Sequence, residues 1–338
     1  MTNKTKLLEI KNLHRHFPIK KGFLEQITLE NGKVTRKVEK VHAINGVDLT
    51  INKGDALCVV GESGCGKSTV ARVVMNLISP TEGEIIYDGT RIDNLKSKTL
   101  LPFRKRMQMI FQNPYASLNP RMTILDTLME PIKFHYPKKT EQERRTILDD
   151  TMESVGIDPS WVVRYPHEFS GGQRQRISIA RALSTDPEFI VADEPISALD
   201  VSIQAQVLNL LMKAREERQL TFLFITHDLS VVEQFGSHVA VMYLGTICEY
   251  TTTKSLFDKP LHPYTQALIS AIPKLEEDNR PHVKLHGEVP TPVNLPTGCV
   301  FHTRCPFAND RCKTETPAKQ EAEPGHFVAC HAVDEDRI

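Results

Sequence analysis

A glycine-rich segment at residues 61–68 has the composition and spacing of a phosphate-binding loop. Its residues are Gly61, Glu62, Ser63, Gly64, Cys65, Gly66, Lys67 and Ser68, which fit the pattern G-x-x-x-x-G-K-[ST]. Successive backbone N–H groups and the N-terminus of the helix expected from Thr69 onward favour phosphate oxygens. We expect Lys67 to neutralise charge on the β- and γ-phosphates of a nucleotide and Ser68 to coordinate Mg²⁺.

Two adjacent carboxylates, Asp193 and Glu194, follow the apolar run at residues 189–192. At the end of a buried strand, Asp193 can hold Mg²⁺ through its coordination shell, as phosphoryl transfer requires. Glu194 is then placed to polarise or deprotonate an attacking water. Alone, the pair would be typical of two solvated acids after a core strand. Together with the phosphate-binding loop, it predicts phosphoryl-transfer chemistry.

The elements that must position these residues are strands alternating with helices. Apolar or alternating runs predict strands at residues 7–17, 41–51, 55–60, 84–88, 189–192, 221–226 and 239–243. Asn31-Gly32 predicts a hairpin turn. Charged segments and prolines indicate a mainly helical insertion over about 115–185, and apolar residues from 203 to 214 mark one face of a helix. This alternation favours an α/β fold with a largely parallel sheet.

Composition sets the broad class. The chain has 338 residues, 40% of them hydrophobic and 25% charged, and a formal net charge of zero, so a fibrous chain or a nucleic-acid polycation is not expected. No run approaches the roughly 18–20 apolar residues of a membrane span, and no signal-peptide pattern begins the chain. We therefore expect a soluble, cytoplasmic protein with two domains, or one large domain with attachments, and no nucleic-acid partner.

With these motifs, the chain resembles the ATPase subunits of ATP-binding cassette (ABC) transporters. Further segments match that family's motifs in the family's order: Gln112 at the Q-loop, residues 169–173 at the signature, residues 197–200 at the D-loop and His227 as the switch histidine. The resemblance implies a P-loop NTPase fold with a mixed core sheet, an antiparallel β subdomain and a helical subdomain. It places this cassette at residues 1–255 and a Cys-rich extension at residues 256–338.

The signature segment has a physical rationale of its own. Ser170, Gly171 and Gly172 precede the helical run at residues 173–183, and a helix N-terminus suits anion binding. A plain capped helix is the alternative. The resemblance implies that two ATPase subunits pack head-to-tail, so that Ser170 and Gly172, with Gln173 and Asp200 nearby, complete the partner's nucleotide site.

Three further residues have roles that follow from the resemblance. Gln112 is expected to reach Mg²⁺ or the attacking water and to report on the membrane partner. His227 is expected to hydrogen-bond the γ-phosphate. Phe17 is the expected adenine-stacking residue, although the insertion at residues 18–40 makes a core phenylalanine the alternative.

A finer resemblance, to the F-type ATPase subunits of bacterial oligopeptide and dipeptide importers, covers nearly the whole chain. It rests on residues 17–22, 111–120, 192–201 and 262–268. It implies import of di- or oligopeptides, with a nickel or other small-solute importer as the competing cargo assignment. A soluble cassette ATPase acting on DNA or ribosomes is a weaker alternative, because the chain has one cassette and no heptad array.

The same resemblance implies a set of partners. These are a D-type ATPase subunit as heterodimer partner, two transmembrane permease subunits and an extracytoplasmic peptide-binding protein. The helical insertion would receive the coupling helices of the permeases. The chain is accordingly expected to be peripheral, at the cytoplasmic face of the inner membrane.

The last 40 residues contain a cysteine cluster, Cys299, Cys305, Cys312 and Cys330. In a reducing compartment four thiolates suit either zinc or an iron–sulfur cluster, and the wide spacing leaves the choice open. The resemblance implies a [4Fe–4S] cluster in some relatives. His302, His326 and His331 are possible substitute ligands, and a metal-free tail is the third alternative.

Overall fold

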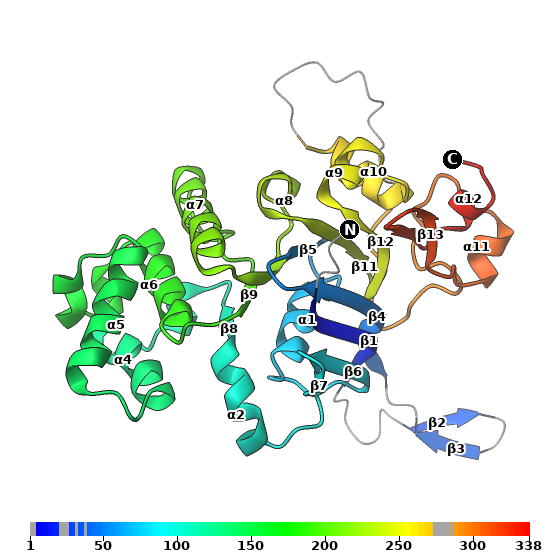
Figure 1. Ribbon diagram of the computed structural model, residues 1–338. Coiled ribbons are helices and arrows are strands. Elements are labelled where there is room, and N and C mark those ends of the chain that lie inside the picture. Colours follow the sequence, from blue (N-terminus) through cyan, green and yellow to red (C-terminus); the bar gives the residue numbers. More distant parts are fainter. Residues whose placement is uncertain (1–4, 20–26, 31–32, 37–38, 273–284, 286) are drawn as a thin grey trace.

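The computed structural model describes residues 5–19, 27–30, 33–36, 39–272, 285 and 287–338, which form a large mixed sheet, a smaller antiparallel sheet and flanking helices (Figure 1). The large sheet has eight strands in the order β13-β14-β12-β11-β5-β10-β9-β8. Its strands are β5 (Ala56–Val60), β8 (Met107–Ile110), β9 (Phe189–Asp193), β10 (Thr221–Ile225), β11 (His238–Tyr243), β12 (Thr246–Thr252), β13 (Gln320–Glu323) and β14 (His326–Val328).

The centre of this sheet is parallel and dry. Strands β8, β9, β10, β5 and β11 run parallel to one another, and every residue of β5, β9 and β10 is buried. Uninterrupted apolar runs produce such strands because helices cover both faces. The β5, β9, β10 and β11 runs are those that the sequence pattern predicts. β8 was not expected, since its run of four residues follows directly on a charged helix.

The antiparallel sheet has the order β4-β1-β6-β7. It comprises β1 (Lys6–Pro18), β4 (Lys40–Asn52), β6 (Glu82–Tyr87) and β7 (Thr90–Arg91), and a separate hairpin pairs β2 (Ile27–Glu30) with β3 (Lys33–Arg36). The hairpin confirms the expectation drawn from the Asn31-Gly32 dipeptide, which itself lies outside the described residues.

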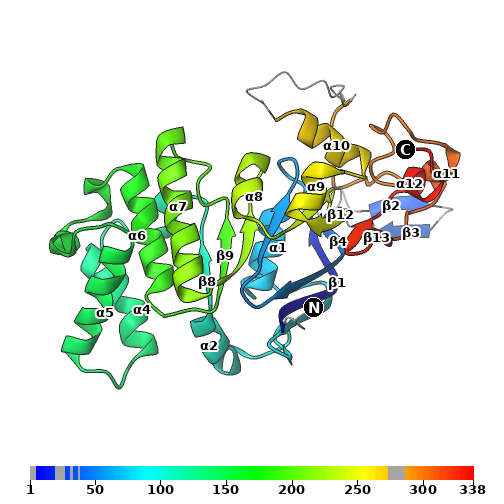
Figure 2. The same ribbon diagram turned by 45° about the horizontal axis from the view of Figure 1, so that its top comes forward.

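The remaining elements are helical. They are α1 (Lys67–Val74), α2 (Ser97–Arg106), α3 (Pro114–Ser117), α4 (Ile124–His135), α5 (Glu141–Ser154), η2 (Pro159–Val163), η3 (Pro166–Glu168), α6 (Gly171–Leu183), α7 (Val201–Arg218), α8 (Leu229–Phe235), α9 (Thr253–Asp258), α10 (Pro263–Ser270), α11 (Asp310–Thr314) and α12 (His331–Asp334). Helices α4, α5 and α6 gather at one end of the molecule, opposite α11, α12 and β13 (Figures 1 and 2). This gathering confirms the expected helical insertion.

Helix α6 packs against α7 at a glycine. A Cβ atom built on Gly172 would lie 2.4 Å from Ile203 Cγ2, far inside normal contact. The neighbouring Gly171 has space, because its Cβ would lie 3.8 Å from Leu199 Cδ2. Ile203 is β-branched and stiff at χ1, so its methyl group cannot move aside cheaply.

The C-terminal region extends the large sheet. Strand β14 pairs with β12, and Glu249 of β12 is fully buried beneath it. The Glu249 carboxylate accepts hydrogen bonds from the backbone N–H groups of Leu261 and His262 and lies 2.7 Å from His326 Nε2. The division of the chain at residue 255 stays a prediction, since the strands on both sides of it share one sheet.

His262 begins helix α10 as a buried cap. Its Nδ1 atom accepts a hydrogen bond from the backbone N–H of Tyr264, which requires an unprotonated nitrogen. Burial lowers the pKa of His262 to about 4. The folded protein therefore holds a neutral imidazole over a pH range in which the unfolded chain binds a proton.

Gly172→Ala is expected to lower the free energy of unfolding by about 1–3 kcal/mol, because the added methyl overpacks the contact with Ile203. Gly171→Ala is the matched control and should change it by no more than about 0.5 kcal/mol. Urea unfolding of the purified chain measures both. Equal effects of the two substitutions would contradict the packing argument.

The free energy of unfolding should fall as the pH drops from 6.5 towards about 4, where His262 is protonated only in the unfolded chain. His262→Asn keeps a capping acceptor and removes the titration, so its loss over the same range should be smaller by about 2–3 kcal/mol. Urea unfolding at pH 7 and pH 4.5 measures this difference. An identical pH dependence in the two proteins would refute the role of His262.

Candidate functional site

The phosphate-binding loop connects β5 to α1 and depends on glycines. Gly61 has φ of 149° and Gly66 has φ of 111°, in the region that favours glycine. A Cβ atom on Gly61 would lie 2.1 Å from the carbonyl oxygen of Met242, and one on Gly66 would lie 2.2 Å from that of Ala43. The loop is thus pressed between β11 and β4, and only glycine fits at these two points.

The side chains of the loop are already ordered. Lys67 is buried, and its Nζ donates to the carbonyl oxygens of Gly61 at 2.7 Å and Glu62 at 3.0 Å. Ser63 and Gly64 are exposed at the loop tip, whereas Cys65 is buried beneath it. The ammonium group therefore sits across the loop, where it can neutralise phosphate charge.

Ser68 joins the loop to the acidic strand end. Its Oγ donates to Asp193 Oδ1 at 2.8 Å, and Asp193 is buried. Burial raises the pKa of Asp193, opposed by the Ser68 hydrogen bond. The sequence-predicted pair is therefore brought together at the carboxyl end of the central strands.

Glu194 lies close to the other two expected catalytic residues, Gln112 and His227. Gln112 Nε2 donates to Glu194 Oε2 at 2.8 Å, and His227 Nδ1 lies 3.6 Å from the same oxygen. Glu194 has φ of 45°, a left-handed conformation that is uncommon for a non-glycine residue. The turn after β9 thus directs this carboxylate away from the core and towards Gln112 and His227.

The signature residues lie apart from the loop. Ser170 caps α6 in a capping box, in which its Oγ accepts from the Gln173 N–H and Gln173 Oε1 accepts from the Ser170 N–H. Asp200 is exposed at the N-cap position of α7. Figures 1 and 2 place α6 and α1 in different parts of the molecule. One phosphate chain could not contact both helix starts within one subunit, and the role of these residues stays a prediction.

Phe17 lies near the end of β1, opposite Val41 of β4. Its ring is half-buried, 4.5 Å from the Arg15 guanidinium, and it is not among the described residues that form the hydrophobic core. Val41 is two residues from Ala43, whose carbonyl touches the loop at Gly66. This position is compatible with the expected adenine contact, which stays a prediction.

Two residues that the motif analysis missed also contact the loop. Tyr264 and Arg304 both bind Glu62, although they lie 202 and 242 positions from it in the chain. Tyr264 lies in the segment that carries the importer resemblance, but no spacing rule connects it to the loop. Only the fold reveals these contacts.

The groove between the core sheet and the helical part has a volume of about 660 Å³. Its lining includes Gln112 and Asp193, together with arginines, a histidine and apolar side chains: Arg72, Arg104, Arg181, His135, Leu77 and Phe111. The groove therefore borders two of the residues expected at the nucleotide site.

The prediction of an iron–sulfur cluster, with zinc as its alternative, is wrong. Among the described residues, no group of three or more His, Cys, Asp or Glu is placed to hold a metal ion. Burial raises the pKa values of Cys299 and Cys305 to about 11 and also raises that of Cys330.

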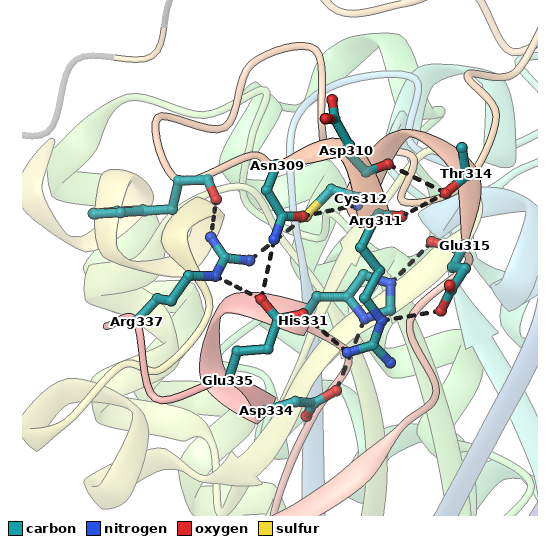
Figure 3. Close-up of polar contacts among 11 residues, drawn as sticks. Asn309, Asp310, Arg311, Cys312, Thr314, Glu315, His331, Asp334, Glu335 and Arg337 are labelled. Carbon is teal, nitrogen blue, oxygen red and sulfur yellow. Dashed lines mark hydrogen bonds and ion pairs between the residues drawn. The ribbon is translucent and has the colours of Figure 1, made fainter.

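One expected ligand, Cys312, and the three substitute histidines have other contacts. Arg337 Nη2 lies 3.9 Å from Cys312 Sγ, and the Cys312 N–H donates to Asn309 (Figure 3). The substitute histidines are engaged as well: His302 contacts the Cys299 carbonyl, His326 contacts Glu249 and His331 contacts the Glu315 carbonyl.

Comparison with known proteins shows which protein family the chain resembles. The family model for ABC transporters matches residues 44–197, and that for the C-terminal region of oligopeptide/dipeptide transporters matches residues 248–312. The chain is 50% identical to the oligopeptide transport ATP-binding protein AppF of Bacillus subtilis, over 97% of this chain and 98% of that protein. It is 45% identical to the dipeptide transport ATP-binding protein DppF of Haemophilus influenzae, over 99% and 100%.

A solved structure agrees with the fold. The ATP-binding cassette MJ0796, in a dimeric post-hydrolysis state bound to ADP and Pi, is 29% identical, covers 73% of this chain and 99% of its own, and has a TM-score of 0.62. No described helix is long and apolar enough to cross a membrane. The chain therefore belongs to the ABC transporter family of ATP-binding proteins, in the group that carries the oligopeptide/dipeptide transporter C-terminal region.

Proposed function

We propose that this chain is the ATP-hydrolysing subunit of an importer of di- or oligopeptides. The observation that carries the proposal is the joining of the phosphate-binding loop to Asp193 and Glu194, through Ser68, in a chain whose near-full-length relatives are named for oligopeptide and dipeptide transport. Those names favour peptides over nickel as cargo.

Residues 61–69 form the nucleotide site. Backbone N–H groups of the loop and the start of α1 bind the phosphates, and Lys67 neutralises their charge. Ser68 Oγ, the Asp193 carboxylate and the Gln112 amide oxygen are hard oxygen donors of the kind that Mg²⁺ prefers. When bound there, Mg²⁺ neutralises charge on the β- and γ-phosphate oxygens.

Glu194 is the general base of hydrolysis. Its carboxylate accepts a proton from water as the water oxygen attacks the γ-phosphorus. The bond between the γ-phosphorus and the bridging oxygen breaks, and ADP leaves with that oxygen on its β-phosphate. The Gln112 amide fixes one carboxylate oxygen at 2.8 Å, which orients the base. His227, 58% exposed, is free to turn towards the γ-phosphate.

The active form is a head-to-tail dimer. Ser170 caps the helix that starts with Gly171, Gly172 and Gln173, and both Ser170 and Asp200 are exposed. In a dimer these groups complete the nucleotide site of the partner, a D-type ATPase subunit. The structure of MJ0796, which is dimeric and bound to ADP and Pi, supports a dimer as the working form.

The groove beside Gln112 receives the coupling helices of two permease subunits. Leu77 on its rim is 53% exposed and Phe134, next to the lining residue His135, is 61% exposed, which gives an apolar contact for a partner helix. An extracytoplasmic binding protein would deliver the peptide. The chain is then peripheral, at the cytoplasmic face of the inner membrane.

Glu194→Gln should keep ATP binding and lower the rate of hydrolysis by about 10²–10⁴-fold, because the amide keeps the shape and loses the base. Steady-state ATPase rates and titration with a fluorescent ATP analogue measure the two effects. Glu233→Gln, an exposed acid on α8, is the control and should leave both unchanged. Near wild-type turnover by Glu194→Gln would overturn the assignment.

A further inference from the structure

The C-terminal region grips one residue of the phosphate-binding loop from two sides. Arg304 Nη1 and Nη2 donate to the two carboxylate oxygens of Glu62, at 2.7 and 3.1 Å. Tyr264 Oη accepts a hydrogen bond from the Glu62 backbone N–H at 2.8 Å. Side chain and backbone of Glu62 are therefore both held by residues far away in the chain.

Arg304 and Tyr264 are held in place because both side chains are buried among aromatic rings. The Arg304 side chain is only 7% exposed and Tyr264 is fully buried. Phe301 packs its ring 5.5 Å from that of Tyr264 and 5.2 Å from that of Tyr243, and the Arg304 guanidinium lies 5.9 Å from the Tyr243 ring. The Glu62 side chain is 29% exposed, so the pair is shielded mainly on its arginine side, and its bidentate geometry fixes position as well as charge.

Glu62 also contacts Lys67, the lysine expected to bind phosphate. Its carbonyl oxygen accepts from Lys67 Nζ at 3.0 Å, beside the Gly61 carbonyl at 2.7 Å. The Glu62 N–H donates to Tyr264 Oη, so the backbone of Glu62 is tied to the C-terminal region on one side and to Lys67 on the other. Arg304 also offsets the negative charge of Glu62, which would otherwise repel phosphate oxygens.

We propose that Arg304 and Tyr264 are positioning residues of the nucleotide site, through which the C-terminal region sets the affinity of the phosphate-binding loop for ATP. The inference rests on the proposed nucleotide-binding role of residues 61–69. A loop that already has its binding conformation loses less conformational entropy when ATP binds. Loss of the contacts with Arg304 and Tyr264 therefore weakens ATP binding.

The test measures the Kd of the purified full chain for a fluorescent ATP analogue. Arg304→Gln should raise the Kd about tenfold, the effect of breaking a charge pair with little exposure, and Tyr264→Phe should raise it severalfold. In a double-mutant cycle, Glu62→Gln should remove most of the Arg304→Gln effect, because the unpaired carboxylate is gone. If Arg304 and Tyr264 had a purely structural role, their substitutions would lower the free energy of unfolding and leave the Kd unchanged. The double-mutant cycle would then show no coupling between Glu62 and Arg304 in the Kd.

Arg311→Gln is the matched control. Arg311 lies in the same C-terminal region, in the polar cluster with Glu315 and Glu335 shown in Figure 3, away from the loop. It should leave the Kd at its wild-type value. Urea unfolding confirms that each variant is folded. Where Arg304→Gln does not fold, Arg304→Lys, which keeps the charge without the bidentate geometry, takes its place and should give a smaller rise.

Two results would overturn the inference: unchanged Kd values in folded Arg304 and Tyr264 variants, or additive effects of the Glu62 and Arg304 substitutions. A wild-type chain that fails to bind the ATP analogue would instead refute the nucleotide site itself. The two failures are therefore distinguishable in one set of titrations.

Discussion

The hydrogen bond from Ser68 Oγ to Asp193 Oδ1 is the contact on which the site depends. It joins two segments 125 positions apart, and it forms only because β5 and β9 lie on either side of β10 in one parallel sheet. The dry, apolar strands fix the register of their carboxyl ends. Lys67, one residue before Ser68, and Glu194, one residue after Asp193, are thereby brought to the same edge of the sheet.

Much of the site could be predicted from the sequence because its motifs are local. Glycines at positions 61 and 66 belong to a short motif that can be recognised without knowing the fold. The uninterrupted apolar run before Asp193 and Glu194 predicts a buried parallel strand, so the two carboxylates are expected at its carboxyl end. The grip of Arg304 on Glu62 could not be predicted, since it spans 242 positions and follows no periodicity. Strand β8 was missed because four residues after a charged helix give too short a pattern.

The cysteine tail shows why residue types without geometry mislead. Four cysteines in 40 residues suggested a metal site, but among the described residues no group of three or more His, Cys, Asp or Glu is placed to hold a metal ion, and Cys312 contacts Arg337 and Asn309. The C-terminal region does more than close the fold. Through β14, Glu249 and His326 it continues the catalytic sheet, and through Tyr264 it reaches the nucleotide loop. Hydrogen bonds from Tyr264 and Arg304 to Glu62 thus join the C-terminal region to the phosphate-binding loop.

The most direct test of peptide import driven by this ATPase is uptake in cells that carry Lys67→Ala in the chromosomal gene. Labelled di-, tri- and pentapeptides and nickel are measured side by side, with immunodetection of the variant protein. The account predicts loss of uptake of at least one peptide class and normal nickel uptake, while the variant accumulates. Loss of nickel uptake alone, or unchanged uptake of every peptide with the variant present, would contradict it.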